Sequence, residues 1–291
     1  MTLFDALIQP FVEFGFMRRA LVATLALGLG SAPIGTLLVL RRMSLMGDAM
    51  AHALLPGAAV GFALAGFSLV AMGGGGFIAA LLVALLAGWV TRVTSQREDA
   101  SFAAFYLIAL AAGVMIISTH GSPVDLMHVL FGSILAVDDQ SLYLVAGVSS
   151  FTLLALAVML RPLVVECFDP GFLRNVGGPG AVVHLGFLLL VVLNLVAGFQ
   201  ALGTLMAVGL MMLPATAARF WVVGLGPQSL VAALMAMLSG WGGLLLSYHF
   251  DLPSGPCIVM WAGGFYIASL LVGRRDSWLS RSLVQRAHRV A

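Results

Sequence analysis

The chain has 291 residues, of which 61% are hydrophobic and only 9% are charged, and its mean hydropathy is +1.08 with a net charge of +2. Soluble domains carry roughly 25% charged residues, so this composition excludes a chain whose outer surface faces water. Its apolar runs are continuous rather than alternating, which disfavours a β-barrel and predicts an all-α, polytopic helical membrane protein.

Nine apolar segments each approach the roughly 20 residues that cross a bilayer. We expect eight or nine of them to be transmembrane helices within one domain, residues 1–291. They are residues 17–40, 48–67, 77–94, 100–119, 142–160, 181–200, 204–222, 230–249 and 257–272. The seventh could begin as a broken helix, because Gly198, Gly203 and Gly209 cluster there with Pro214.

Arginine placement predicts the orientation of these spans. Arginines follow the odd-numbered spans and are concentrated in the tail, residues 273–291. Because cytoplasmic loops are enriched in basic residues, we expect the N-terminus outside and this basic tail in the cytoplasm. Arg18 and Arg19 disagree with this pattern.

Two connections are expected to contain short helices. Residues 120–140 have an amphipathic core, residues 125–137, which predicts a short outer or re-entrant helix. Residues 161–180 lie on the cytoplasmic side in this topology. There Asp169 is suited to be an N-cap and Pro170 to occupy the first helical position, which predicts a short helix over residues 170–176.

The second span opens with an acid and an imidazole, Asp48 and His52. Their i, i+4 spacing places both side chains on one face of a helix. A carboxylate oxygen and an imidazole nitrogen suit a borderline divalent ion such as zinc, manganese or iron(II). An ionisable side chain inside a membrane segment indicates a functional site, although Asp48 could instead be the N-cap of this helix and His52 a satisfied interior histidine.

Pro56 is expected to make a backbone oxygen available next to this pair. Because proline lacks an N–H, the carbonyl four residues earlier, that of His52, loses its helical partner and becomes available to a metal or to water. Small residues at positions 49, 53, 57 and 61 predict close packing of another helix on the adjacent face.

Other polar residues give weaker signals. Asn194 and Gln200 could line a path or bond across helices, and Pro214 could shape a gate. His249 and Asp251 more plausibly belong to a turn. Met43, Met46 and Met50 lie near Asp48 in sequence; thioethers bind copper(I), but filling gaps in a core is their commoner use.

Several enzyme classes lack their motifs here. The sequence has no GxxxxGK[ST] phosphate loop, no HExxH and no GxSxG, so we expect neither ATP hydrolysis by this chain nor protease or hydrolase activity. Cys167 and Cys257 are far apart in sequence, which disfavours a thiolate metal centre. We expect no permanently bound cofactor and no nucleic-acid partner.

Four segments resemble one known family, the permease subunits of ABC importers for zinc, manganese and iron(II). RRMSLMGDAMAHALLPGAAVG resembles the family signature, and three further matches follow it in the same order along the chain. They are HVLFGSILAVDDQSL (residues 128–142), ALGTLMAVGLMMLPATAARF (residues 201–220) and DLPSGPCIVM (residues 251–260).

The resemblance implies a multi-pass permease of the bacterial plasma membrane that works as a dimer, with two copies or two related chains. Its partners would be cytoplasmic ATPase subunits and an extracytoplasmic metal-binding protein. The metal pathway would include Asp48 and His52, and the cargo would be zinc or, next, manganese. The ATPase would dock on the segment containing Phe168, Asp169, Pro170, Phe172 and Arg174, in which Gly171 replaces an acid of the family pattern. Rival interpretations are an ion-coupled transporter or channel that needs no ATP, and an ABC permease for a metal chelate or vitamin.

Overall fold

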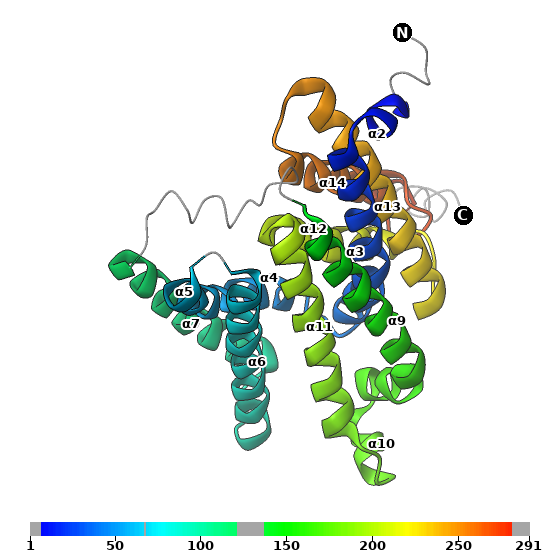
Figure 1. Ribbon diagram of the computed structural model, residues 1–291. Coiled ribbons are helices and arrows are strands. Elements are labelled where there is room, and N and C mark those ends of the chain that lie inside the picture. Colours follow the sequence, from blue (N-terminus) through cyan, green and yellow to red (C-terminus); the bar gives the residue numbers. More distant parts are fainter. Residues whose placement is uncertain (1–6, 67, 121–136, 281–291) are drawn as a thin grey trace, which may run out of the picture.

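The computed structural model describes residues 7–66, 68–120 and 137–280, and all regular elements within these ranges are helices (Figure 1). They form eight spans long and apolar enough to cross a membrane, one of which is α4 and α5 together, in agreement with the predicted fold class. The helices are α2 (Gln9–Glu13), α3 (Gly15–Leu40), α4 (Met46–Ala53), α5 (Leu55–Ala65), α6 (Leu69–Val93), α7 (Glu98–His120), α9 (Asp139–Phe168), α10 (Pro170–Asn175), α11 (Gly180–Leu202), α12 (Thr204–Ala218), α13 (Leu225–Phe250) and α14 (Ser254–Val272). The helix predicted for residues 125–137 lies almost wholly outside the described residues.

Three predicted spans differ from the structure. The second is two helices, α4 and α5, which meet at Leu54 beside Pro56. The fifth is longer than predicted, because α9 continues through Pro162 to Phe168. The seventh, α12, has 15 residues and is therefore about 22 Å long, shorter than the roughly 30 Å hydrocarbon core. It begins at Thr204, directly after Gly203, whose φ of 94° places the break between α11 and α12 and not within the seventh span.

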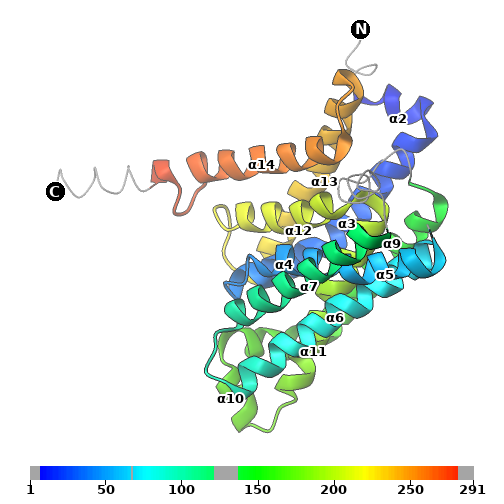
Figure 2. The same cartoon turned by 90° about the vertical axis from the view of Figure 1, so that its left-hand side faces the viewer.

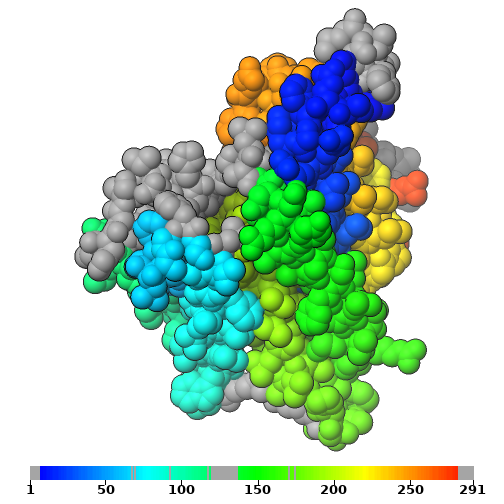
Figure 3. Space-filling model, viewed as in Figure 1, coloured from blue at the N-terminus to red at the C-terminus, as the bar shows by residue number. Residues whose placement is uncertain are grey.

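The helices form two groups that meet through α11. One group consists of α4, α5, α6 and α7, and the other contains α3, α9, α12, α13 and α14. Figure 3 shows α5 and α6 on one side of the molecule and α9 on the other. An apolar groove between α6 and α11 is lined by Leu81, Ala84, Leu85, Val182, Leu185 and Leu189. The main core cluster joins both groups, from Leu38 of α3 and Met50 of α4 to Phe187 of α11.

Contacts between helix ends agree with the predicted alternation of the spans. At one end of the molecule, Arg19 lies 3.5 Å from Asp139 and the Phe14 ring lies 5.7 Å from that of Tyr248, so the starts of α3 and α9 lie on the same side as the end of α13. Figure 2 shows α2 and the α13–α14 turn at this end and α10 at the opposite end. The ion pair also gives the exceptional Arg19 a local partner.

The opposite end of the molecule contains connections that the arginine pattern assigns to the cytoplasmic side. The Arg275 N–H donates to the Phe220 carbonyl at 2.9 Å, which brings the end of α12 and the end of α14 together. Arg41, at the end of α3, contacts His184 at the start of α11. The connections after α3, α12 and α14 and the one before α11 therefore share one side.

Candidate metal site and coupling segment

Asp48 and His52 lie on one face of α4, as their spacing predicts. The His52 Nε2 is 3.6 Å from the Asp48 Oδ1. The His52 side chain is 36% exposed and the Asp48 side chain is 61% exposed. The N-cap interpretation of Asp48 is wrong, because the N-cap of α4 is Leu45 and Asp48 lies within the first turn. The carboxylate therefore gains from the positive end of the helix dipole while it keeps its oxygens available to a ligand.

The interruption between α4 and α5 lies directly after this pair. Pro56 is at the start of α5, and the His52 carbonyl accepts from the Leu54 N–H at the end of α4. The carbonyl has thus left the regular α-helical pattern, as predicted, but it has a new backbone partner. Helix α7 packs against this interruption: a Cβ added to Gly113 would lie 3.0 Å from the Pro56 nitrogen.

Helices α5 and α6 touch backbone to backbone along part of the predicted stripe of small residues. A Cβ at Gly57 would lie 1.9 Å from the Gly75 carbonyl oxygen, and one at Gly61 would lie 2.3 Å from the Ala71 carbonyl oxygen. These glycines let α6 approach to a distance that any side chain would prevent. The interface fixes α5, and through Leu54 it limits how α4 can tilt.

A tyrosine that sequence analysis missed lies beside the pair. The rings of Tyr106 in α7 and His52 are stacked, with centroids 6.3 Å apart and planes 26° apart. The stacking restricts the orientation of the imidazole. Tyr106 lies in an apolar stretch and nothing in its sequence context links it to a residue 54 positions away, so only the tertiary structure identifies it.

The pair has two metal-ligating side chains. Within the described part of the chain, no group of three or more His, Cys, Asp or Glu side chains is placed to hold a metal ion. Two open ligands on an exposed face suit a site that a second surface completes or a site that an ion passes through. A closed structural zinc site would have four ligands.

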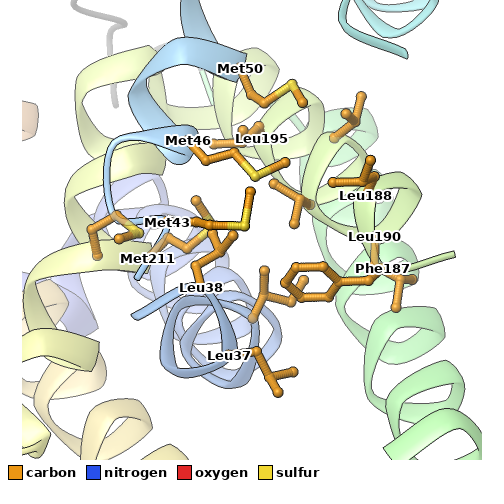
Figure 4. Packing of buried hydrophobic residues seen from close by; sticks show 14 of the residues in the cluster. Leu37, Leu38, Met43, Met46, Met50, Phe187, Leu188, Leu190, Leu195 and Met211 are labelled. Atoms are coloured by element: carbon orange, nitrogen blue, oxygen red, sulfur yellow. The ribbon is translucent and has the colours of Figure 1, made fainter. Parts of the chain in front are cut away.

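The methionines next to the pair in sequence have a structural role. Met43, Met46 and Met50 point away from solvent into a cluster with Leu195 of α11 and Met211 of α12 (Figure 4). All three are almost fully buried. They fill the contact between α4 and α11, and the exposed Asp48–His52 face contains none of them, which favours the gap-filling interpretation over copper(I) binding.

The other predicted pathway residues lie among packed helices; Asn194 and Pro214 are buried and Gln200 is partly buried. The Asn194 side chain donates to Thr152 of α9 at 2.7 Å and to the Leu190 carbonyl at 2.9 Å, so it bonds across helices. Gln200 lies against Gly73 of α6, where an added Cβ would collide with its amide. Pro214 is buried inside α12 without ending that helix. None of these contacts joins them to Asp48 or His52.

The predicted coupling segment is a short capped helix at the end of α9. The Asp169 carboxylate accepts from the Phe172 N–H at 2.8 Å, which confirms the predicted cap. Helix α10 begins at Pro170 and ends at Asn175, one residue earlier than predicted. Phe168, Phe172 and Val176 are exposed, an apolar patch that would be costly in water and is typical of a protein contact. The side chains of Pro170 and Arg174 lie outside the described part of the structure.

Sequence analysis also missed His184, which is buried at the start of α11 between Arg41 and Glu98. The available signal was an ionisable residue within an apolar segment, the same signal that identified Asp48.

Comparisons with known proteins agree with one another. The sequence model of the ABC 3 transport family matches residues 13–273. The manganese import system permease protein ScaB of Streptococcus parasanguinis is 32% identical over 269 residues, which cover 92% of this chain and 95% of ScaB. The chelated iron transport system membrane protein YfeD of Yersinia pestis is 32% identical over 269 residues, which cover 92% and 89% of the two chains. Among solved structures, PsaBC from Streptococcus pneumoniae in complex with Fab has a TM-score of 0.83 and 28% identity, and the match covers 98% of this chain and 100% of that one.

Proposed function

The chain belongs to the ABC 3 transport family, and from this premise we propose that it is the membrane permease of an ATP-driven importer of divalent transition metal ions, with Asp48 and His52 on the path of the ion. The observation that carries this proposal is the open Asp48–His52 face of α4. It combines a hard oxygen and a borderline nitrogen, the ligand types that such ions accept.

We propose that two copies, or two related chains, complete the site. One chain supplies a carboxylate and an imidazole and leaves both partly exposed, so a partner across a two-fold axis would double the ligand set. Ligands from two separate chains can part when the chains move, and a transport site must release its ion. The same exposure would be costly if this face lay against lipid.

Manganese(II) or iron(II) is proposed as the cargo ahead of zinc. The names of the relatives mention manganese and chelated iron, which gives no support to our sequence-based preference for zinc. An aspartate–histidine pair without a thiolate accepts all three ions. Selection among them would then depend on the binding protein and on the number of ligands in the assembled site.

Transport is proposed to follow alternating access driven through α10. The exposed Phe168, Phe172 and Val176 form a surface suited to a cytoplasmic ATPase subunit. Under this proposal the side that contains α10 and Arg41 is the cytoplasmic side, in agreement with the arginine distribution. A binding protein would deliver the ion at the opposite side, near the α13–α14 turn.

Uptake of radioactive manganese and iron by cells that depend on this importer tests the proposal. Asp48→Ala and His52→Ala should each abolish accumulation at normal expression, because each removes a ligand. Thr36→Val is the control: it removes a buried hydrogen bond between Thr36 of α3 and Ser229 of α13, 2.8 Å long, away from the pair and from the proposed delivery side, so uptake should persist. Normal uptake by both α4 variants would refute the site, and wild-type uptake that survives ATP depletion would favour an ion-coupled transporter or channel.

A further inference from the structure

A buried polar cluster joins three helices on the side of the molecule that contains α10. An Arg41 guanidinium nitrogen lies 2.9 Å from the His184 Nδ1, and the His184 Nε2 lies 3.1 Å from the Glu98 Oε1. Arg41 follows α3, Glu98 opens α7 and His184 is in the first turns of α11. His184 is only 7% exposed.

The partners of His184 fix the protonation state of its ring. Arginine can only donate hydrogen bonds, so the Nδ1 that faces Arg41 must be the acceptor. The ring proton is then on Nε2 and faces the Glu98 carboxylate. His184 therefore lies between a cation and an anion. The Arg41 guanidinium is also held 5.3 Å above the Phe187 ring.

The cluster touches the elements next to the proposed coupling helix. Cys167, in the last turn of α9 and one residue before the exposed Phe168, packs against the core cluster that contains Phe187, the ring beneath Arg41. Just before α11, Gly178 is packed so closely on Leu173 of α10 that an added Cβ would lie 2.6 Å from that side chain. A displacement of α10 is therefore passed toward the polar cluster through the end of α9 and through the start of α11.

The cluster also lies next to α4, which carries the metal-ligating pair, and to α7, which packs beside that pair. Arg41 lies seven residues before Asp48, with only the Arg42–Leu45 connection between α3 and α4. Glu98 opens α7, the helix whose Tyr106 is stacked on His52. His184 thus contacts both the residue leading into α4 and the residue opening α7.

We propose that His184 is a positioning residue for transport, which holds Arg41 and Glu98 so that a movement of α10 displaces α4 and α7 together. The proposal rests on the proposed function, since it assumes that an ATPase acts on α10 and that an ion passes Asp48 and His52. The Arg41–His184 hydrogen bond suits this task because bonds with a charged partner are directional and short, and the 3.1 Å contact with the Glu98 carboxylate holds the other side of the ring. An apolar contact at the same place would let the two helices slide independently.

The test measures metal uptake and ATP hydrolysis in the same vesicles, with the full importer reconstituted from permease, ATPase and binding protein. His184→Leu removes both polar contacts at similar volume and should lower the manganese accumulated per ATP hydrolysed by about tenfold, within the range for residues that couple two sites. His184→Gln should restore most of this ratio, because its amide oxygen can accept from Arg41 while its NH₂ faces Glu98. Thr36→Val, which breaks the 2.8 Å hydrogen bond between α3 and Ser229 of α13, is the matched control and should leave the ratio unchanged.

The outcomes separate the inference from the proposed function. An unchanged ratio for His184→Leu, or a ratio for His184→Gln as low as that for His184→Leu, would overturn the positioning role. If His184→Leu is not recovered in folded form, Glu98→Gln decides, since this more exposed residue tolerates the isosteric change; it should lower the ratio, and an unchanged ratio would overturn the role. Wild-type vesicles that accumulate no manganese, iron or zinc would refute the proposed function and the inference with it.

Discussion

Replacing Gly57 by alanine would force apart α5 and α6, which touch backbone to backbone. The added Cβ would lie 1.9 Å from the Gly75 carbonyl oxygen, 2.4 Å from its carbon and 2.8 Å from the Ala79 Cβ. Two of these atoms are backbone, so no side-chain rotation relieves the contact. Since heavy atoms reach their optimal separation near 3.5–4.0 Å, α5 and α6 would have to separate by roughly 1.5 Å.

The expected cost follows from two opposing terms. Overpacking of this kind destabilises a core by about 1–3 kcal/mol, and alanine recovers up to about 1 kcal/mol through its higher helix propensity. With the full alanine gain the net loss against wild type is about 0–2 kcal/mol, an increase of up to about 30-fold in the equilibrium constant for unfolding. Against another glycine-to-alanine variant, which has the same propensity gain, the loss is about 1–3 kcal/mol.

Equilibrium unfolding in detergent micelles, followed by circular dichroism, measures this change. Gly74→Ala on α6, the partner helix in this contact, is the matched control, because its Cβ would have no neighbour within 4 Å; this variant should be as stable as wild type or slightly more stable. A Gly57→Ala protein whose midpoint equals that of Gly74→Ala would refute the backbone contact. It would also remove the reason for expecting α5 and α6 to move as one unit.

Two further predictions concern the ends of helices. Arg42 has a left-handed φ of 60° and closes α3, with the Met43 N–H donating to the Leu38 carbonyl at 2.9 Å; glycine adopts this conformation without the steric cost. Arg42→Gly should therefore stabilise the protein by about 0.5–1 kcal/mol in the same unfolding assay, and a loss of stability would show that the Arg42 side chain makes a contact worth more than the strain. Phe172→Ser should leave folding unchanged, because the ring is exposed, and should reduce the amount of ATPase subunit that co-purifies; full recovery of the complex would remove Phe172 from the docking surface.

Local sequence signals predicted the features that depend on neighbouring residues. The i, i+4 spacing placed Asp48 and His52 on one face of α4, the Asp169–Pro170 pair predicted the start of α10, and the glycine at 203 predicted a helix break. Each follows from bonds or angles within a few residues, so the sequence contains the information.

The errors arose where hydropathy was used to set the end of a helix. The fifth apolar run was predicted to end at residue 160, yet α9 continues through Pro162 to Phe168. Hydropathy predicts where a chain leaves the hydrocarbon, whereas a helix can continue beyond it, and proline is tolerated in such helices when other groups satisfy the freed carbonyl. The contact between Arg41 and His184 joins residues 143 positions apart, and no local pattern predicts it.

The methionines that pack beneath α4 determine how oxidation would affect this protein. Met43, Met46, Met50 and Met211 fill the contact between the two helical groups (Figure 4). Unbranched thioethers can repack when helices shift, which keeps such a contact filled in more than one arrangement. Burial shields these sulfurs, but a movement that exposes them to an oxidant would place a polar sulfoxide oxygen in this apolar layer. Oxidative damage would therefore disable movement of α4 even in a chain whose aspartate, histidine and ATPase contacts are intact.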